Sequence, residues 1–203
     1  FAMMVPDRPS HLGSEVAAFA ARIAPAGAVN GLAQVVLRCA SPGVPDLYQG
    51  TEFWDFSLVD PDNRRPVDYA TRRNLLAAED TEIAQTRDGR LKLRFARDLL
   101  RLRRQHPDLF GLGSYEAIAA TGVSAERIVA FARQHEGTSL LVAATLFPAR
   151  EMSWTDEQIA LGQDQERWTS LLDGREITAR QGALAAADLF VTLPVVVLMP
   201  AKV

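Results

Sequence analysis

The spacing of the apolar residues changes near Gly111, and this change limits the fold more than any other feature of the sequence. Before it, apolar residues recur at every third or fourth position, most regularly from Leu91 to Leu102, which is typical of amphipathic helices. After it, apolar residues stand in short runs separated by Gly, Thr or charged residues, which is typical of strands joined by turns. Helices followed by strands predict an α+β protein. We expect one part at 1–110 and a second at 111–203.

The first part is predicted to contain helices, one strand and a long loop. Ser10 and Asn30 can cap helix N-termini, and Pro25 and Gly27 separate the two helices that would follow them. The predicted helices cover residues 10–23, 30–39, 69–84 and 91–105. Residues 44–48 are apolar and bounded by turn residues, so they predict a buried strand. Residues 49–66 are rich in Asp, Asn and Pro, and a loop of this length is usually functional or disordered. Its aromatic residues argue against disorder.

The second part is predicted to be an antiparallel β-sandwich, because several short strands follow one another at close intervals. The predicted strands cover residues 114–120, 127–133, 139–146, 168–172, 189–193 and 195–199. Asp173 and Gly174 stand between two apolar runs and favour a hairpin turn there.

Composition excludes several classes of function. The formal net charge is −3 with acidic and basic residues interspersed, so no nucleic-acid partner is expected. No membrane partner is expected either, because no run of about 20 apolar residues is evident. The three histidines are scattered and form no metal-ligand pattern. Cys39 is the only cysteine, which with the lack of a signal peptide favours the cytoplasm.

The chain starts at Phe1 within an apparent loop, so we expect a piece of a longer protein.

Two runs in the middle of the first part carry a recognisable motif. Residues 42–52 read PGVPDLYQGTE, and residues 58–69 read LVDPDNRRPVDY. The first run resembles the eighth-strand motif of the α-amylase clan, in which a Gly-x-Pro strand leads into Tyr-x-Gly-x-Glu. The two runs together resemble maltooligosyltrehalose synthases in particular. Supporting stretches of the same resemblance lie at 88–92, 102–107 and 129–133.

The resemblance implies a fold and an activity. It implies that the first part is the C-terminal end of a (β/α)8 barrel, including its eighth strand, and that a β-sandwich follows. Such barrels build their active sites at the C-terminal ends of the strands, so the loop after 44–48 would face substrate. The implied enzyme is an isomerase that converts the reducing-end α-1,4 linkage of a maltooligosaccharide into an α,α-1,1 linkage. No cofactor is implied.

The catalytic carboxylates of the clan have no counterpart in this sequence. The implied retaining mechanism uses an aspartate nucleophile, a glutamate acid/base and a supporting aspartate. No histidine precedes an aspartate here, and the only acids before the eighth-strand motif are Asp7 and Glu15. Glu52 and Asp60 follow that strand, which is too late in the chain. We therefore assign no catalytic residue and expect this chain alone to be inactive.

Six residues of the long loop are candidates for contacts with a bound sugar. Carboxylates, amides and guanidinium groups exchange hydrogen bonds with hydroxyls, and an indole ring stacks on a sugar face. The candidates are Trp54, Asp60, Asp62, Asn63, Arg64 and Arg65. The alternative is a loop whose charged groups satisfy one another, with Phe53 and Trp54 wedged against the barrel.

For several other residues a structural role is preferred. Glu52 is expected to accept backbone hydrogen bonds in its turn, and Tyr48 to point into the barrel. The arginines of 91–105 are expected on a solvated helix face. Trp154 and Trp168 are expected in the core of the sandwich rather than on a glucan-binding surface.

Two rival functions stay open at this point. One is another α-amylase-clan enzyme, such as an oligo-α-glucosidase or a sucrose-active transglucosidase. The other is a non-catalytic glucan-binding module. The 44–48 strand would lack both of its barrel neighbours in this chain, so we expect its exposed edge to be covered. A homodimer through this edge is favoured, and the alternatives are collapse of the helices onto each other and loss of order at 44–48.

Overall fold

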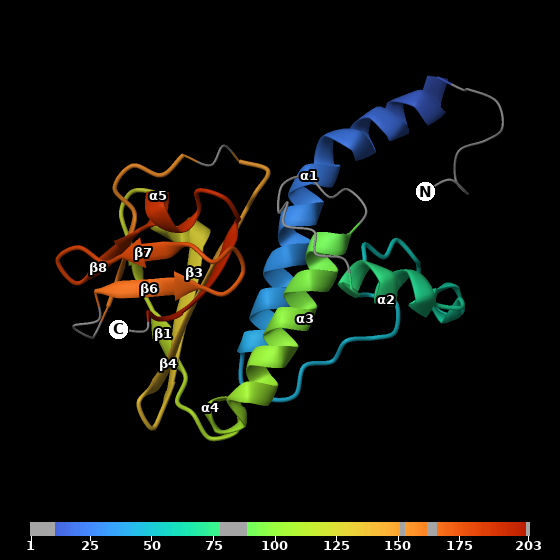
Figure 1. Ribbon diagram of the computed structural model, residues 1–203. Helices are drawn as coiled ribbons and strands as arrows, with labels where there is room; N and C mark the ends of the chain where they lie inside the picture. Colours follow the sequence, from blue (N-terminus) through green and yellow to red (C-terminus); the bar gives the residue numbers. More distant parts are fainter. Residues whose placement is uncertain (1–10, 78–88, 151–152, 162–165, 202–203) are drawn as a thin grey trace.

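The computed structural model describes residues 11–77, 89–150, 153–161 and 166–201. Apart from the short α5, the α-helices come first and the strands second along the chain, as predicted (Figure 1). The helices are α1 (His11–Ala40), α2 (Tyr69–Ala77), α3 (Arg90–Gln105), α4 (Pro107–Gly111) and α5 (Ala186–Leu189). Two short 3-10 helices lie at Asp62–Arg64 and Ala125–Arg127.

α1 is one continuous helix of 30 residues, where two separate helices were predicted. Pro25 lies inside it. A proline removes one backbone hydrogen bond and bends a helix without always ending it, since the surrounding turns keep their own bonds. Figure 1 shows α1 changing direction along its length. Ser10, the predicted cap, lies outside the described residues.

α3 begins and ends almost where the sequence predicted. Its apolar stripe is buried at Phe95, Leu99 and Leu102, and α3 packs along the C-terminal half of α1. α2 agrees with the start of the helix predicted at 69–84, and the rest of that prediction lies outside the described residues.

The strand predicted at 44–48 is not formed, and Val44 is 94% exposed. A strand needs neighbours to pair with its backbone groups, and none of the described strands lies beside this segment. Arginine side chains hold the segment instead, since Arg38 donates to the Asp46 carbonyl at 2.9 Å and Arg103 to the Gly43 carbonyl at 2.5 Å. Tyr48 is 45% exposed rather than enclosed. The homodimer predicted through this edge is untested, and the described residues offer no strand edge there.

The strands form two antiparallel sheets. The strands are β1 (Glu116–Ile118), β2 (Ala120–Thr121), β3 (Ile128–His135), β4 (Thr138–Thr145), β5 (Gln158–Ala160), β6 (Arg167–Ser170), β7 (Glu176–Thr178), β8 (Ala183–Ala185) and β9 (Val195–Pro200). Among the described residues, one sheet has the order β1-β3-β4-β9-β6-β7 and the other the order β2-β5-β8. The predicted hairpin joins β6 to β7, with Gly174 at φ 72°.

The strand predictions fail where the strands are shortest. The strand predicted at 189–193 is wrong, because its first residue ends α5 and a turn follows. The run predicted at 114–120 is divided between β1 and β2, which belong to different sheets. β5 and β8 were not predicted, and β7 was implied only by the hairpin turn at Asp173 and Gly174. Each of these three strands has three residues.

The side chains of β4 and β9 point alternately to the two faces of the large sheet, and an apolar core lies on each face. Leu140, Val142 and Ala144 of β4 join the first core, on the side of α1 and α3. Leu141 and Ala143 join the second core, which lies between the two sheets. Successive side chains of a strand point to opposite faces, so this sheet is covered by helices on one face and by the smaller sheet on the other. Trp168, predicted as a core residue, is 3% exposed in the second core.

The first core crosses the predicted boundary at residue 110. It unites residues of α1, α3 and α4 with residues of β3, β4 and β9. The described residues of 1–110 and 111–203 therefore share one apolar interior, although the division into these two parts stays a prediction. Cys39 is buried in that core as predicted.

Two arginines close the C-terminal end of α1. Arg103 donates to the Cys39 carbonyl at 2.9 Å, so it is not part of a solvated face as predicted. Arg133 is 1% exposed, and its guanidinium donates to the carbonyl of Ala40, the last residue of α1, at 3.5 Å. It also donates to the carbonyls of Phe110, Gly113 and Ser114 at 3.0–3.2 Å. The last carbonyls of a helix carry partial negative charge, which favours cations at this end.

Of the described helices, α1 alone has the length and apolar composition needed to cross a membrane, which the sequence analysis did not anticipate. The core helix of a water-soluble protein meets the same criterion. The composition of α1 therefore assigns no membrane partner, and the expectation of none stays untested.

Candidate functional site

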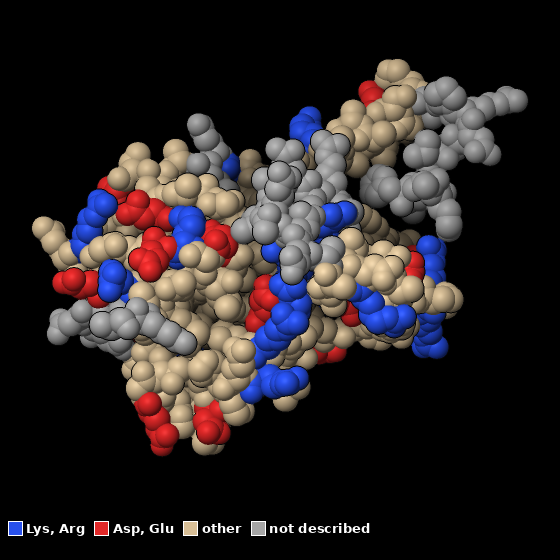
Figure 2. All heavy atoms as spheres, viewed as in Figure 1, with Lys and Arg blue, Asp and Glu red and all other residues tan. Residues whose placement is uncertain are grey.

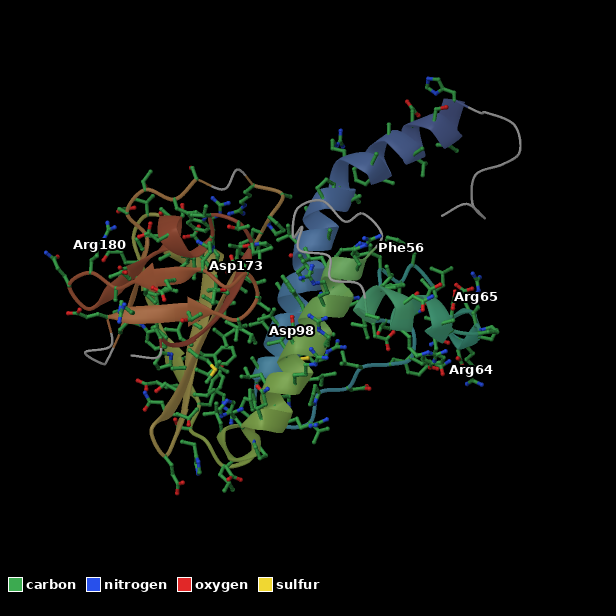
Figure 3. The ribbon with its side chains drawn as sticks, in the orientation of Figure 1. Phe56, Arg64, Arg65, Asp98, Asp173 and Arg180 are labelled. Atoms are coloured by element: carbon green, nitrogen blue, oxygen red, sulfur yellow. The ribbon has the colours of Figure 1, made fainter. Side chains whose placement is uncertain are left out.

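A cavity of about 320 Å³ lies between the long loop and the start of α2. It is lined by Gln49, Gly50, Phe53, Trp54, Asp55, Phe56, Ser57, Asp62, Asn63, Arg65, Pro66, Val67, Asp68 and Arg72. Four of the six predicted sugar contacts are in this lining, namely Trp54, Asp62, Asn63 and Arg65. The other two, Asp60 and Arg64, are not. Figure 3 shows Arg64 and Arg65 at the outer end of the loop, beyond α2.

The entry to the loop is a tight turn at Gly50. Its φ is 86°, a conformation that favours glycine, and the Thr51 N–H donates to the Tyr48 carbonyl at 3.1 Å. The Thr51 hydroxyl donates to the same carbonyl at 2.6 Å. The turn reverses the chain so that the residues after it line the cavity.

Arg72 holds the two ends of the loop together, a role that the sequence analysis missed. It donates from Nε to Glu52 Oε2 at 3.0 Å and from Nη2 to the Gly50 carbonyl at 2.8 Å. Its guanidinium also lies 4.4 Å from the centre of the Phe53 ring. The prediction that Glu52 binds backbone groups is therefore wrong, because its partner is the Arg72 side chain. These contacts join residues 20 or more positions apart, so no local pattern reveals them.

The predicted charged residues pair with one another. Arg64 donates from Nε to Asp60 Oδ1 at 2.6 Å, and Arg65 forms an ion pair with Asp62. Asp62 also accepts the Leu58 N–H at 2.8 Å. Asp60 and Arg64 are both more than half exposed, and an ion pair of that kind contributes little stability. Both groups of such a pair are available to a ligand that offers better hydrogen bonds.

Asn63 brings to the cavity a buried side-chain oxygen, Oδ1, without a hydrogen-bond partner among the residues that the structure describes. The neighbouring acids do have partners. Hydrogen bonds from Ser57 lower the pKa of Asp55, and hydrogen bonds from Thr71 lower the pKa of Asp68. Both carboxylates are therefore held in the charged form by local donors.

Trp54 is anchored between the helices rather than free at the surface. A Cβ atom placed on Gly31 of α1 would lie 2.9 Å from its ring, so the indole packs directly on the backbone of α1. The Lys92 ammonium, from α3, lies 5.6 Å from the ring centre and donates to the Phe53 carbonyl at 3.0 Å. Burial lowers the pKa of Lys92. These contacts favour the structural alternative for Trp54.

Phe56 is the aromatic residue at the cavity that the sequence analysis did not select. Its side chain is 73% exposed, and Figure 3 shows it above α2, apart from Arg64 and Arg65 at the outer end of the loop. An exposed ring beside polar groups is the combination that sugars bind. The sequence offered only its place in an aromatic loop as a signal.

The described residues contain no group of three or more His, Cys, Asp or Glu residues that could hold a metal ion. Figure 2 shows acidic and basic residues mixed over much of the visible face, with Lys and Arg gathered in a band over α3. The site is therefore a polar loop with one exposed ring, held by its own ion pairs.

The chain resembles known proteins over nearly its whole length. It is 41% identical over 196 residues to a Mycobacterium tuberculosis protein described as "Putative maltooligosyl trehalose synthase", which covers 97% of this chain and 23% of that relative. The solved maltooligosyltrehalose synthase of Arthrobacter ramosus is 36% identical, with a TM-score of 0.80 over 98% of this chain and 25% of that one. No family model matches the sequence.

An α-amylase from Anoxybacillus shares the fold, with a TM-score of 0.55 at 20% identity over 85% of this chain. The chain spans about a quarter of the length of the synthases that it matches. Over the segment that it spans, the chain belongs to the maltooligosyltrehalose synthase family.

Proposed function

We propose that this chain is part of an isomerase that converts the reducing-end α-1,4 linkage of a maltooligosaccharide into an α,α-1,1 linkage. The observation that carries the proposal is the 41% identity over 97% of the chain to a protein described as a maltooligosyl trehalose synthase. In that reading, the helices belong to the C-terminal end of a (β/α)8 barrel, and the strands belong to a β-sandwich after it. The cytoplasm is the proposed location, supported by a single, buried cysteine.

The chain alone is proposed to be inactive. A retaining mechanism needs two carboxyl groups about 5–5.5 Å apart, one as nucleophile and one as acid/base. The acids around the cavity are engaged with protein groups: Glu52 with Arg72, Asp60 with Arg64, Asp62 with Arg65, Asp55 with Ser57 and Asp68 with Thr71. This pairing supports a role in shape and binding rather than in bond cleavage.

The loop is proposed to form part of the subsite that holds the released glucose while it turns over. Arg65 and Asn63 supply donors and an acceptor beside the cavity, and Phe56 supplies an exposed ring. A sugar held on several sides is kept from exchanging with water, which isomerisation requires.

The first experiment separates this chain from the full-length enzyme. Purified chain and a full-length relative, as positive control, are incubated with maltopentaose, and the products are separated by chromatography. We expect a non-reducing product from the full-length enzyme alone. A non-reducing product from the chain alone would contradict its inactivity, and glucose release by the full-length enzyme without isomerised product would point to a hydrolase of the clan.

The second experiment tests the subsite in a full-length enzyme that carries this segment. Replacing Arg65 with Ala is expected to raise the ratio of free glucose to isomerised product, because a lost hydrogen bond from a charged group costs about 1.5–3 kcal/mol, roughly 10- to 150-fold. Replacing Arg64 with Ala is the matched control, since Arg64 lies outside the cavity lining and should change the ratio less. Equal ratios in both variants and the parent would make the loop purely structural.

A further inference from the structure

The cavity-lining loop belongs to the segment that joins α1 to α2 (Figure 1), and Arg72 of α2 contacts both of its ends. Where the loop begins, Arg72 donates from Nε to Glu52 Oε2 at 3.0 Å and from Nη2 to the Gly50 carbonyl at 2.8 Å. Just after the loop ends, Arg72 donates from Nη1 to the Asp68 carbonyl at 3.1 Å. The cavity-lining residues at 53–67 lie between these two attachment points. One side chain therefore sets how far apart the two ends of the loop lie.

The guanidinium group of Arg72 is engaged within the protein. Each of its three nitrogen atoms donates to a protein oxygen, and the group also lies 4.4 Å from the centre of the Phe53 ring. The side chain of Arg72 is 13% exposed, whereas that of Arg65 is 60% exposed and pairs with an acid three positions away. Arg72 is therefore suited to hold the loop, and Arg65 is suited to exchange its partner for a ligand.

The contacts of Arg72 do not depend on the rest of the synthases. Each of them joins Arg72 to another residue of this chain, at positions 50, 52, 53 and 68. They therefore need no residue from the part of the synthases that the chain does not span.

We propose that Arg72 is a positioning residue for the reaction, which acts through the loop on the fate of the released glucose. This inference rests on the proposed function. The glycosyl group can pass to the anomeric hydroxyl of the retained glucose, which gives the α,α-1,1 product. If the glucose leaves first, water takes up the glycosyl group, and free glucose and a shortened maltooligosaccharide result. By fixing the loop, Arg72 favours the first of these outcomes.

Small movements of the loop are sufficient for this effect. A displacement of about 1 Å at a reacting group can cost about 100-fold in rate. Without the Arg72 contacts, the two ends of the loop are no longer tied to each other, and the residues between them lose their fixed distance from the sugar. The transfer to glucose then slows relative to the reaction with water, which needs no positioned acceptor sugar.

The alternative is that Arg72 only stabilises the fold. Loss of a purely structural contact lowers the melting temperature and the amount of folded enzyme. It does not change the ratio of two products that the same folded molecules make. The ratio of free glucose to isomerised product therefore distinguishes a positioning role from a structural role.

The experiment uses a full-length enzyme that carries this segment, with maltopentaose as substrate. Arg72→Met is expected to raise the ratio of free glucose to isomerised product about threefold or more. Arg72→Lys keeps the charge beside Glu52 but lacks the planar fork that reaches the carbonyls, so its ratio should lie between those of the parent and Arg72→Met. Arg73→Met is the matched control, because Arg73 is exposed on the same helix, and its ratio should equal that of the parent. The melting temperature of each variant is measured alongside.

A double variant tests whether Arg72 acts through the loop. If it does, combining Arg72→Met with Arg65→Ala should give a ratio close to that of the more severe single variant, because both changes disturb the same sugar contact. Fold-changes that multiply in the double variant would overturn the positioning role.

The outcomes separate this inference from the proposed function. A ratio that rises in Arg65→Ala but not in Arg72→Met would overturn the inference and leave the proposed subsite standing. Equal ratios in all variants would overturn both, and a parent enzyme that makes no isomerised product would contradict the proposed function itself. If Arg72→Met does not fold, Arg72→Lys decides the question, and a ratio equal to that of the parent would overturn the inference.

Discussion

Replacing Arg133 with Met is expected to lower the free energy of unfolding by about 2–4 kcal/mol. The side chain is 1% exposed and donates three hydrogen bonds of 3.0–3.2 Å to the carbonyls of Ser114, Phe110 and Gly113. A hydrogen bond from a charged group contributes about 1.5–3 kcal/mol, and the loss of three is partly offset because methionine avoids the cost of burying a cation.

Urea unfolding followed by circular dichroism and tryptophan fluorescence measures this loss. For a chain of this size, the loss corresponds to a fall in melting temperature of roughly 5–15 °C. Arg133→Lys should also destabilise, because an ammonium group lacks the planar fork that reaches three carbonyls. Arg104→Met removes an exposed arginine and should change the unfolding free energy by less than about 0.5 kcal/mol. If Arg133→Met or Arg133→Lys unfolds like the parent, the carbonyl cluster does not hold the helices to the sheet.

Two further predictions concern the backbone and pH. Gly89→Ala is expected to lower the free energy of unfolding by more than about 1 kcal/mol beyond the effect of Gly174→Ala. Both glycines have positive φ, but a Cβ at Gly89 would lie 2.8 Å from the backbone nitrogen of Trp54, whereas a Cβ at Gly174 would meet open space. Equal melting temperatures of the two variants would contradict this. Hydrogen bonds from backbone N–H groups, that of Thr155 first, lower the pKa of Glu157 below 4.5, so its contribution to stability is present above that pH and is lost as pH falls through the lowered value. The deficit of Glu157→Gln in unfolding free energy should therefore shrink on acidification, and a deficit independent of pH would refute the assignment.

The sequence predicted the elements that local pattern determines. α3 was found because its apolar stripe repeats over 16 residues, and β3, β4 and β9 because their apolar runs are long. β5, β7 and β8 have three residues each, too few for alternation to stand out from chance. Their pairing depends on strands far away in the chain, which the local sequence does not show.

The candidate loop was located correctly, but its internal contacts were not. Asp62 and Arg65 are close in sequence, so their pairing was among the alternatives considered. Arg72 and Lys92 reach the loop from helices 20 and more residues later, and only the fold brings them there. The strand predicted at 44–48 is an error of the other kind. Its local sequence is typical of a strand, but the described residues provide no neighbouring strand to pair with it.

The indole of Trp54 rests on α1, while Gly89 and Lys92 at the start of α3 contact the loop at Phe53 and Trp54. The first core clamps the same two helices against the large sheet. The loop is therefore attached to two helices whose positions depend on their packing against the large sheet. A substitution in that sheet, far from any bound sugar, should still change the position of the loop. Variants selected for a changed ratio of free glucose to isomerised product should therefore include substitutions in β4 and β9, which do not contact the sugar.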